Sequence, residues 1–317
     1  MPAVLAQIAI ILGLILVALV AGNNLSVCVG SVIGSRVMKR RSGILLTIVA
    51  YTVGLVVQGG FLGHTVSLLL SQGNPLALDV ALAIAIGVFV IAEVARVPQS
   101  LTVTLTAILV GVDVAVSGVA KLGFVDTIVA FWITMPLLSF VFVAVVMRWA
   151  STRLPKNDIW GNVKVMKLAL IATSFFVAFT LGGNTIGLIA RMMPASGISF
   201  MGIDATFIGI VAAIVVGCVL FSQGPLNRIG NEIIPMRYLN AVGAMFISAF
   251  LVEIATLVGV PLSNTDAFVA SVYGAGVSYR RRLIRRRPFF TIVGLRILAG
   301  ICGFIAGFVA IYAIAVL

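Results

Sequence analysis

The chain has 317 residues, of which 62% are hydrophobic and 9% are charged, and its formal net charge at pH 7 is +12. So little polar surface cannot cover a soluble domain of this size, and that class is excluded. The Lys and Arg residues lie in short clusters between apolar runs, as in cytoplasmic loops that face anionic lipid, which argues against a nucleic-acid-binding protein. Composition therefore indicates a multi-pass protein of the cell membrane that contacts lipid.

Apolar runs long enough to cross the hydrocarbon core as helices recur along the whole chain. Crossings are expected at 3–21, 43–60, 76–95, 101–121, 124–149, 164–181, 202–222, 239–260, 263–279 and 289–316. Two shorter segments, 23–38 and 184–198, are rich in Gly, Asn and Ser, and we interpret them as re-entrant helices. The predicted fold is an all-α polytopic membrane protein with about ten transmembrane helices and two re-entrant segments.

Basic residues give this order of crossings an orientation, because positively charged loops stay in the cytoplasm. Every rich cluster falls on one side: residues 36–41, Arg96, 148–167, Arg228 with Arg237, and 279–287. The other side holds Lys121, Arg191 and His64. Both termini are therefore predicted to be extracytoplasmic.

Two motifs recur at nearly the same spacing. "AGNN" and "GGNT" relate Asn23 to Asn184, an offset of 184 − 23 = 161 residues, and "VPQSLT" and "VPLSNT" relate Pro98 to Pro261, an offset of 261 − 98 = 163. The agreement indicates a duplication, and five crossings per copy make the second copy inverted. We expect a first repeat at 1–150, a cytoplasmic linker at 151–162 and a second repeat at 163–317. Inverted repeats with a site near the midplane are typical of secondary transporters.

Polar residues within the repeated motifs form a candidate binding site. Glycines beside Asn23 and Asn184 are expected to let the backbone break, so that a new helix starts there and offers free N–H groups to an anion. Ser100 and Ser263, each two residues after a proline, are expected to cap two more helix starts. Four such starts would suit a small oxyanion. The alternative is that these Asn, Ser and Thr residues only hydrogen-bond across helices as packing groups.

These motifs resemble a known family. The paired "GNN" and "GGN" segments, the paired "VPQSLT" and "GVPLSNTDAFVASVYGAGV", and the stretch "NRIGNEIIPMRYLNAVGAMFISAFLVEIATLVG" are similar to the inorganic phosphate transporters. Those proteins are sodium- or proton-coupled phosphate permeases with relatives that carry sulfate, and the resemblance covers nearly the whole chain. It implies a secondary transporter working by alternating access. An enzyme is not expected, since the chain has no HExxH or GxSxG motif and only one His.

The chain departs from the family at chemically important positions. The family pattern is Gly, a small residue, Asn and then Asp in each half, followed later by Pro-Val-Ser-Thr-Thr-His. Asn23 and Asn184 match the family Asn, whereas Asn24 and Thr185 replace its two aspartates. In the second motif Pro98, Ser100, Thr102, Pro261, Ser263 and Thr265 match, Leu101 and Asn264 replace Thr, and Val103 and Asp266 replace His.

The resemblance implies an anion site built from both halves. Its expected members are Asn23, Asn24, Ser100, Thr102, Asn184, Thr185, Ser263, Asn264 and Thr265. Loss of both aspartates favours coupling to H⁺ over Na⁺, and the proton carrier is then an intramembrane acid. Asp266 is the first candidate, followed by Glu253, Glu93 and Asp113, with a structural ion pair as the alternative for the two glutamates. No cofactor and no metal site is expected beyond the coupling ion.

The substrate has two candidates. The family favours phosphate, whereas the exchange of Asp for Asn and Thr favours sulfate, which carries no proton for a carboxylate to accept. A passive anion channel and a transport-dead sensor or scaffold are the alternatives from other classes. A homodimer is left open.

Overall fold

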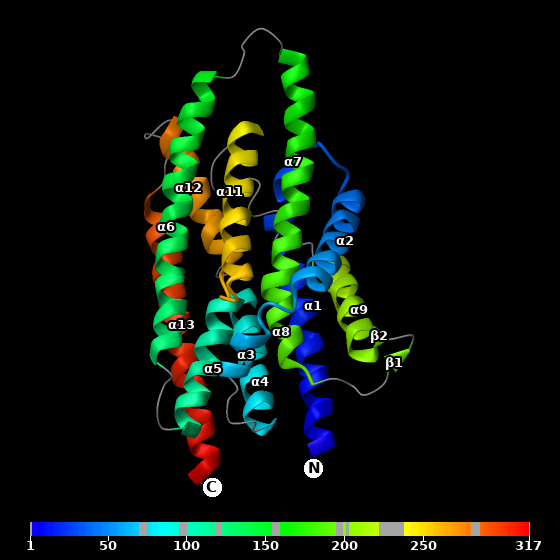
Figure 1. Cartoon of the computed structure of the whole chain (residues 1–317), viewed down its shortest axis with the longest axis vertical. Coiled ribbons are helices and arrows are strands. Elements are labelled where there is room, and N and C mark those ends of the chain that lie inside the picture. Colours follow the sequence, from blue (N-terminus) through cyan, green and yellow to red (C-terminus); the bar gives the residue numbers. More distant parts are fainter. Residues whose placement is uncertain are drawn as a thin grey trace.

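The computed structural model of the chain is a bundle of long helices that run roughly side by side (Figure 1). It describes residues 2–69, 75–94, 100–117, 122–153, 159–194, 199–200, 203–221, 238–279 and 286–316. The helices of the first half are α1 (Pro2–Gly34), α2 (Arg40–Gln58), α3 (Gly63–Leu69), α4 (Pro75–Val94), α5 (Leu101–Ser117) and α6 (Leu122–Arg153). The second half has α7 (Ile159–Leu181), the π-helical turn η1 (Gly182–Ile186), α8 (Gly187–Met192), α9 (Ala205–Leu220), α11 (Tyr238–Leu257), α12 (Asn264–Tyr279) and α13 (Arg286–Val316). The antiparallel strands β1 (Ser199–Phe200) and β2 (Ile203–Asp204) connect α8 to α9.

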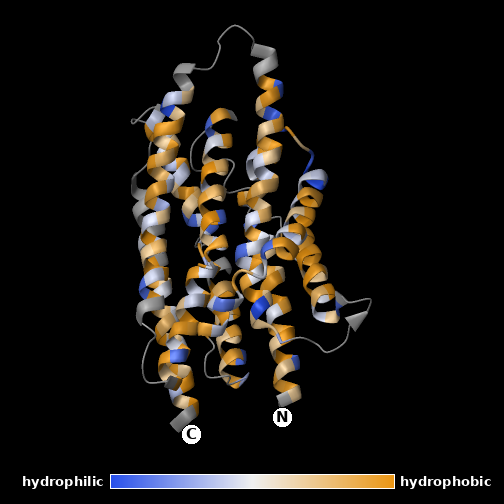
Figure 2. Cartoon of the chain, in the orientation of Figure 1, coloured by the Kyte–Doolittle hydropathy of each residue, from blue (hydrophilic) through white to orange (hydrophobic). Residues whose placement is uncertain are grey.

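Hydrophobic residues predominate along the helices (Figure 2), and many large hydrophobic side chains are exposed. Leu45, Ile133 and Leu168, on three different helices, are each more than 60% exposed. In the described part of the chain six helices are long and apolar enough to cross a membrane. An exposed apolar surface of this kind is expected only where lipid replaces water as the solvent.

The two Asn-bearing segments are not re-entrant, and that prediction is wrong. Residues 23–38 do not begin a new helix, because α1 continues without interruption from Pro2 to Gly34. Residues 184–192 likewise continue the helix that begins with α7, through the π-helical turn η1 into α8. The expected helix starts at Asn23 and Asn184 are therefore absent, since both residues lie inside helices.

The glycines beside these asparagines have a different role, which is close helix packing. A Cβ atom on Gly22 of α1 would collide with the backbone of Gly217 in α9, and one on Gly183 of η1 would collide with Gln58 of α2. Gly54 of α2 in turn lies against the backbone of α7. Small residues that let two helix backbones touch are typical of membrane helix pairs. The glycine pattern indicated a helix break, but its physical cause is a helix crossing.

Two helical hairpins occupy opposite ends of the bundle. The pair α4 and α5 lies in the lower part of the bundle, and the pair α11 and α12 lies in the upper part (Figure 1). The two helices of each pair pack on each other. We interpret these hairpins, which carry the Pro-Ser motifs, as the elements that enter from opposite sides of the membrane.

The packing of the helices repeats between the two halves. Helix α5 packs on α13, and its sequence counterpart α12 packs on α6; helix α1 packs on α9, and its counterpart α7 packs on α2. Helices α1 and α7 run in opposite directions, and both chain termini lie at one end (Figure 1). We interpret this arrangement as two copies of one unit that are inverted relative to each other and whose elements pack mainly on the other copy.

The described basic clusters lie at the end of the bundle opposite the termini. The connection from α1 to α2, the last turns of α6 and the first turns of α7 lie toward that end (Figure 1). These segments carry Arg36, Lys39 and Arg148 and the basic residues at the starts of α2 and α7. Arg96, Lys121, Arg228, Arg237 and residues 280–285 lie outside the described residues.

Candidate functional site

Two hydrogen bonds inside the bundle connect the two halves, and they involve four polar side chains from four elements. The Thr265 hydroxyl donates a hydrogen bond to Asn24 Oδ1 (3.3 Å), and the hydroxyls of Thr102 and Thr185 are hydrogen-bonded at 3.3 Å. The sequence offsets make Thr185 the counterpart of Asn24 and Thr265 the counterpart of Thr102. The same contact is therefore formed twice, each time between one copy and the other. We call Asn24, Thr102, Thr185 and Thr265 the cross-repeat quartet.

Asn184 is fully engaged by the connection between α11 and α12. Its Nδ2 donates to Thr256 Oγ1 (2.8 Å) and to the Val260 carbonyl (3.3 Å), and its Oδ1 accepts from the Leu262 backbone N–H (3.1 Å). The side chain has no exposed surface. The wide turn of η1 places it there, as π-helical turns often do at functional positions. Asn184 therefore fixes the tip of the second hairpin directly beside the quartet.

The start of α12 is capped as the sequence predicts. The Asp266 backbone N–H donates to Ser263 Oγ (3.2 Å), which confirms the predicted serine cap. Asn264 is 3% exposed; its Nδ2 donates to Thr180 Oγ1 (3.3 Å), whereas its Oδ1 is buried and accepts no hydrogen bond from the described residues. In the first half Ser100 immediately precedes α5 and is equally buried.

Asn23 is not at a helix start. It is partly buried in the middle of α1, and its carbonyl accepts from Ser26 Oγ at 3.3 Å. Thus the structure brings two helix starts, α5 and α12, to two points in the middle of helices, α1 and η1. The arrangement of four converging helix starts is wrong, because only the proline-bearing connections interrupt the helices.

The candidate coupling acids lie at different places. Glu253 in α11 accepts a hydrogen bond from Gln58 Nε2, across the two halves. Asp266 is the third residue of α12 and lies in its first turn. Asp113 in α5 is buried and lines a separate cavity. The side chain of Glu93 lies outside the described residues.

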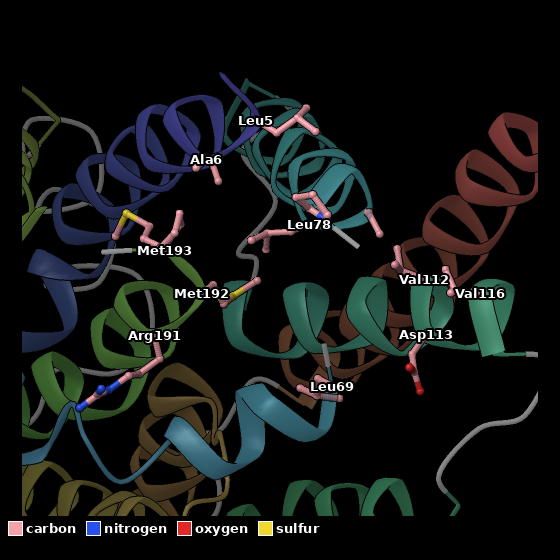
Figure 3. Close-up of a pocket in the computed structure, with 14 residues that line it drawn as sticks. Leu5, Ala6, Leu69, Leu78, Val112, Asp113, Val116, Arg191, Met192 and Met193 are labelled. Atoms are coloured by element: carbon pink, nitrogen blue, oxygen red, sulfur yellow. The ribbon is translucent and has the colours of Figure 1, made fainter. Parts of the chain in front are cut away.

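That cavity, of about 300 Å³, lies at the end of the bundle where the chain begins, between α1, α4, α5 and α8. It is mainly apolar, with Leu78, Met192 and Met193 on its walls (Figure 3). The Arg191 side chain extends away from these residues, and its Nε donates to the Gly59 carbonyl (3.0 Å). The cavity is separate from the quartet and does not resemble an anion site.

Several residues of the site were not expected from the sequence. Trp132 Nε1 donates to the Pro261 carbonyl (2.9 Å), and the Thr65 hydroxyl donates to the carbonyl of Gly259, whose φ is +77°. Together with Asn184 they hold the connection from residue 258 to residue 263. All of these contacts join residues at least 72 positions apart in the chain. No local sequence pattern therefore signals them.

The chemistry of the site is that of neutral hydrogen-bond donors. Hydroxyl and amide groups dominate, and no Lys or Arg belongs to the quartet or to the start of α12. The N-terminus of α12 adds partial positive charge from its backbone. Such a set holds a small oxyanion through hydrogen bonds rather than through a fixed counter-charge.

Comparison with known proteins agrees with this arrangement. The sequence profile of the phosphate transporter family (PHO4) matches the chain twice, over residues 20–161 and over residues 158–307. The chain belongs to the phosphate transporter family. Membership of this family makes it a membrane transporter rather than an enzyme. The two matches also agree with the two copies seen in the packing.

Relatives within the phosphate transporter family carry different names. The chain is 25% identical to a "putative phosphate permease" of Methanocaldococcus jannaschii over 95% of both chains. It is 24% identical to the sulfate permease CysP of Bacillus subtilis, over 85% of this chain and 77% of that one. A solved structure of a sodium-dependent phosphate transporter superposes with a TM-score of 0.77 at 18% identity, covering 98% of this chain and 99% of the other. That likeness establishes the shared fold.

Proposed function

We propose that the protein is a secondary transporter of inorganic phosphate that works by alternating access and binds the anion at the cross-repeat quartet. The observation that carries the proposal is the paired contact of Thr265 with Asn24 and of Thr102 with Thr185, both between copies. A substrate bound where two inverted copies meet is exposed to either side as the copies rock against each other. Ser100, Asn184, Ser263 and Asn264 each lie within two positions of a quartet residue in the chain and orient it.

The coupling ion that suits this site is the proton. A sodium ion benefits from carboxylate ligands, and neither Asn24 nor Thr185 supplies one. Asp266 lies next to the quartet residue Thr265, at the helix start that would attract the anion. An ionised carboxylate there repels an anion, whereas a protonated one does not, so proton and anion binding favour each other. Glu253 and Asp113 are further acids within the bundle.

Sulfate is the second candidate substrate, and the neutral quartet is the observation that favours it. Sulfate has no proton to donate and is held best by donors alone, as these hydroxyls and amides provide. Phosphate remains the first candidate because the hydroxyl of monohydrogen phosphate donates a hydrogen bond. The buried Asn264 Oδ1 is a suitable acceptor for it. The two anions are distinguished by competition for the same site.

The orientation in the cell membrane follows from charge. The bundle end with the described basic clusters faces the cytoplasm, and both termini face outward. The anion then passes between the hairpin α4–α5, which enters from outside, and the hairpin α11–α12, which enters from the cytoplasm.

Uptake into proteoliposomes tests the proposal. The purified protein is expected to accumulate labelled phosphate when the outside is acidic, with no requirement for sodium, and unlabelled sulfate is expected to compete. Saturable sulfate uptake that phosphate does not inhibit would identify a sulfate permease instead. Conductance without accumulation identifies a channel, and the absence of any anion movement identifies a sensor or scaffold.

A matched pair of variants links the transport to the quartet. T265V removes the hydroxyl that donates to Asn24 Oδ1, and T173V removes a buried hydroxyl that bonds only to carbonyls of its own helix. We expect T265V to raise the KM for the anion by about tenfold, the equivalent of one hydrogen bond, and T173V to leave it unchanged. Equal KM values in both variants would place the anion elsewhere.

A further inference from the structure

A pair of polar side chains joins the two halves of the chain next to the quartet. Gln58 is the last residue of α2, and its Nε2 donates a hydrogen bond to Oε1 of Glu253 in α11. Gln58 is 3% exposed and Glu253 is partly buried. The two residues are 195 positions apart and come from different copies.

Each side chain of this pair has one oxygen without a hydrogen-bond donor. Gln58 Oε1 and Glu253 Oε2 are buried and accept no hydrogen bond within the described part of the chain. While the carboxyl is ionised, both atoms are acceptors, and a buried acceptor without a donor is costly. One proton on Glu253 Oε2 satisfies both, because the acid O–H then donates to the amide oxygen while the amide N–H still donates to the other carboxyl oxygen.

The charged groups around Glu253 do not neutralise its carboxylate. The described titratable groups on α11's packing partners and on the nearby α2, α3 and α8 are Asp126, Arg148, Lys164, Lys167, Asp266, Tyr273, Arg40, Arg41, Tyr51, His64 and Arg191. Among the residues that the structure describes, Glu253 forms no ion pair with any of these groups, and its hydrogen-bond partner there is the neutral amide of Gln58. A mobile proton, rather than a fixed cation, is therefore the natural counter-charge for this carboxyl.

We propose that Gln58 and Glu253 form the proton-binding site of the transporter, with the proton held between Glu253 Oε2 and Gln58 Oε1. The inference rests on the proposed function and assigns the coupling proton to Glu253 rather than to Asp266, whose carboxyl lies beside the anion site. The carboxylate takes one proton from the side from which the anion enters, becoming a carboxylic acid, and returns it to solution on the other side. Only an O–H bond forms and breaks. Gln58 is a positioning residue, which acts through Glu253.

The pair is connected to the anion site through two elements. Gln58 packs on Gly183 so closely that a methyl group on this glycine would collide with its side chain, and the next residue is Asn184. Asn184 donates to Thr256, which lies one turn after Glu253 in α11. Protonation therefore adds a hydrogen bond between the copies close to the tip of the α11–α12 hairpin. Because the copies must separate and rejoin during transport, proton occupancy changes the balance between the two orientations.

The test uses the full-length protein in proteoliposomes and two assays. One measures phosphate accumulation under an inward proton gradient, and the other measures phosphate exchange at equal pH on both sides. The variant E253Q places an amide opposite Gln58, and two amides form the same two hydrogen bonds as the protonated pair. We expect E253Q to lose accumulation by at least about tenfold while exchange falls much less. D126N, which neutralises an exposed acid near the start of α6, is the matched control and is expected to behave as the wild type in both assays.

A second readout does not depend on transport. Infrared difference spectra are expected to show a protonated carboxyl band in the wild type at neutral pH, absent in E253Q and shifted in frequency in Q58L, where the acid O–H has lost its acceptor. Three results would each overturn the assignment. They are accumulation by E253Q within about twofold of the wild type, absence of the band in the wild type, and an unshifted band in Q58L. If the wild type moves neither phosphate nor sulfate, the proposed function fails, and the infrared result still decides the proton site.

Discussion

Removal of the Asn184 side chain is expected to loosen the α11–α12 connection. The variant N184A loses three hydrogen bonds, to Thr256, Val260 and Leu262. Side-chain hydrogen bonds between membrane helices contribute about 0.6 kcal/mol on average, so three contribute about 2 kcal/mol. The Leu262 N–H, left buried without an acceptor, adds about 1–3 kcal/mol. The expected loss of stability is therefore about 3–5 kcal/mol.

The assay is equilibrium unfolding in mixed detergent micelles, followed by circular dichroism. T173V is the control, because it keeps the volume of a buried side chain and removes only a hydroxyl that donates to carbonyls of α7. We expect T173V to change the free energy of unfolding by less than about 1 kcal/mol. If N184A is no less stable than T173V, Asn184 does not hold the hairpin tip, and its role as a positioning residue is refuted.

Three further outcomes follow from packing and burial. G217A is expected to destabilise the protein by more than about 2 kcal/mol, because the added methyl would collide with the α1 backbone, whereas G30A, which points into open space, is expected to be neutral in the same melting assay. D79N is expected to raise the unfolding free energy by about 1–2 kcal/mol, because both carboxyl oxygens of Asp79 are buried without a partner in the described structure, and a lowered melting temperature would contradict this. S263A is expected to cost about 1 kcal/mol through loss of the α12 cap, measured against the conservative S263T.

The sequence was sufficient to predict where most helices lie, because a long apolar run has few other structures available to it in a membrane. It did not predict that the runs at 76–95 and 101–121, and at 239–260 and 263–279, form hairpins in opposite parts of the bundle instead of full crossings. It also indicated the duplication, since Asn23 with Asn184 and Pro98 with Pro261 keep nearly one offset. The packing of α5 on α13 and of α12 on α6 agrees with that duplication. The serine cap at Ser263 was equally accessible, because capping depends on residues only three positions apart.

The polar contacts inside the bundle were not accessible in the same way. Gly22 and Gly183 suggest a flexible backbone when considered alone, and only the presence of Gly217 or Gln58 opposite them shows that they make room for a neighbour. Asn184 was expected to bind the anion, but its three bonds go to residues more than 70 positions away. The pairing of Gln58 with Glu253 depends on tertiary structure entirely, because nothing in either segment specifies the other.

The two contacts of the quartet are equivalent in place but not in chemistry. One pairs an amide with a hydroxyl, Asn24 with Thr265, and the other pairs two hydroxyls, Thr185 with Thr102. When inverted copies exchange roles, a perfectly symmetric pair would give the outward-open and inward-open forms equal free energies. Because Asn24 and Thr185 differ, the free energies of the two forms are no longer equal. We expect the empty transporter to have a preferred resting side, determined in part by which copy carries the asparagine.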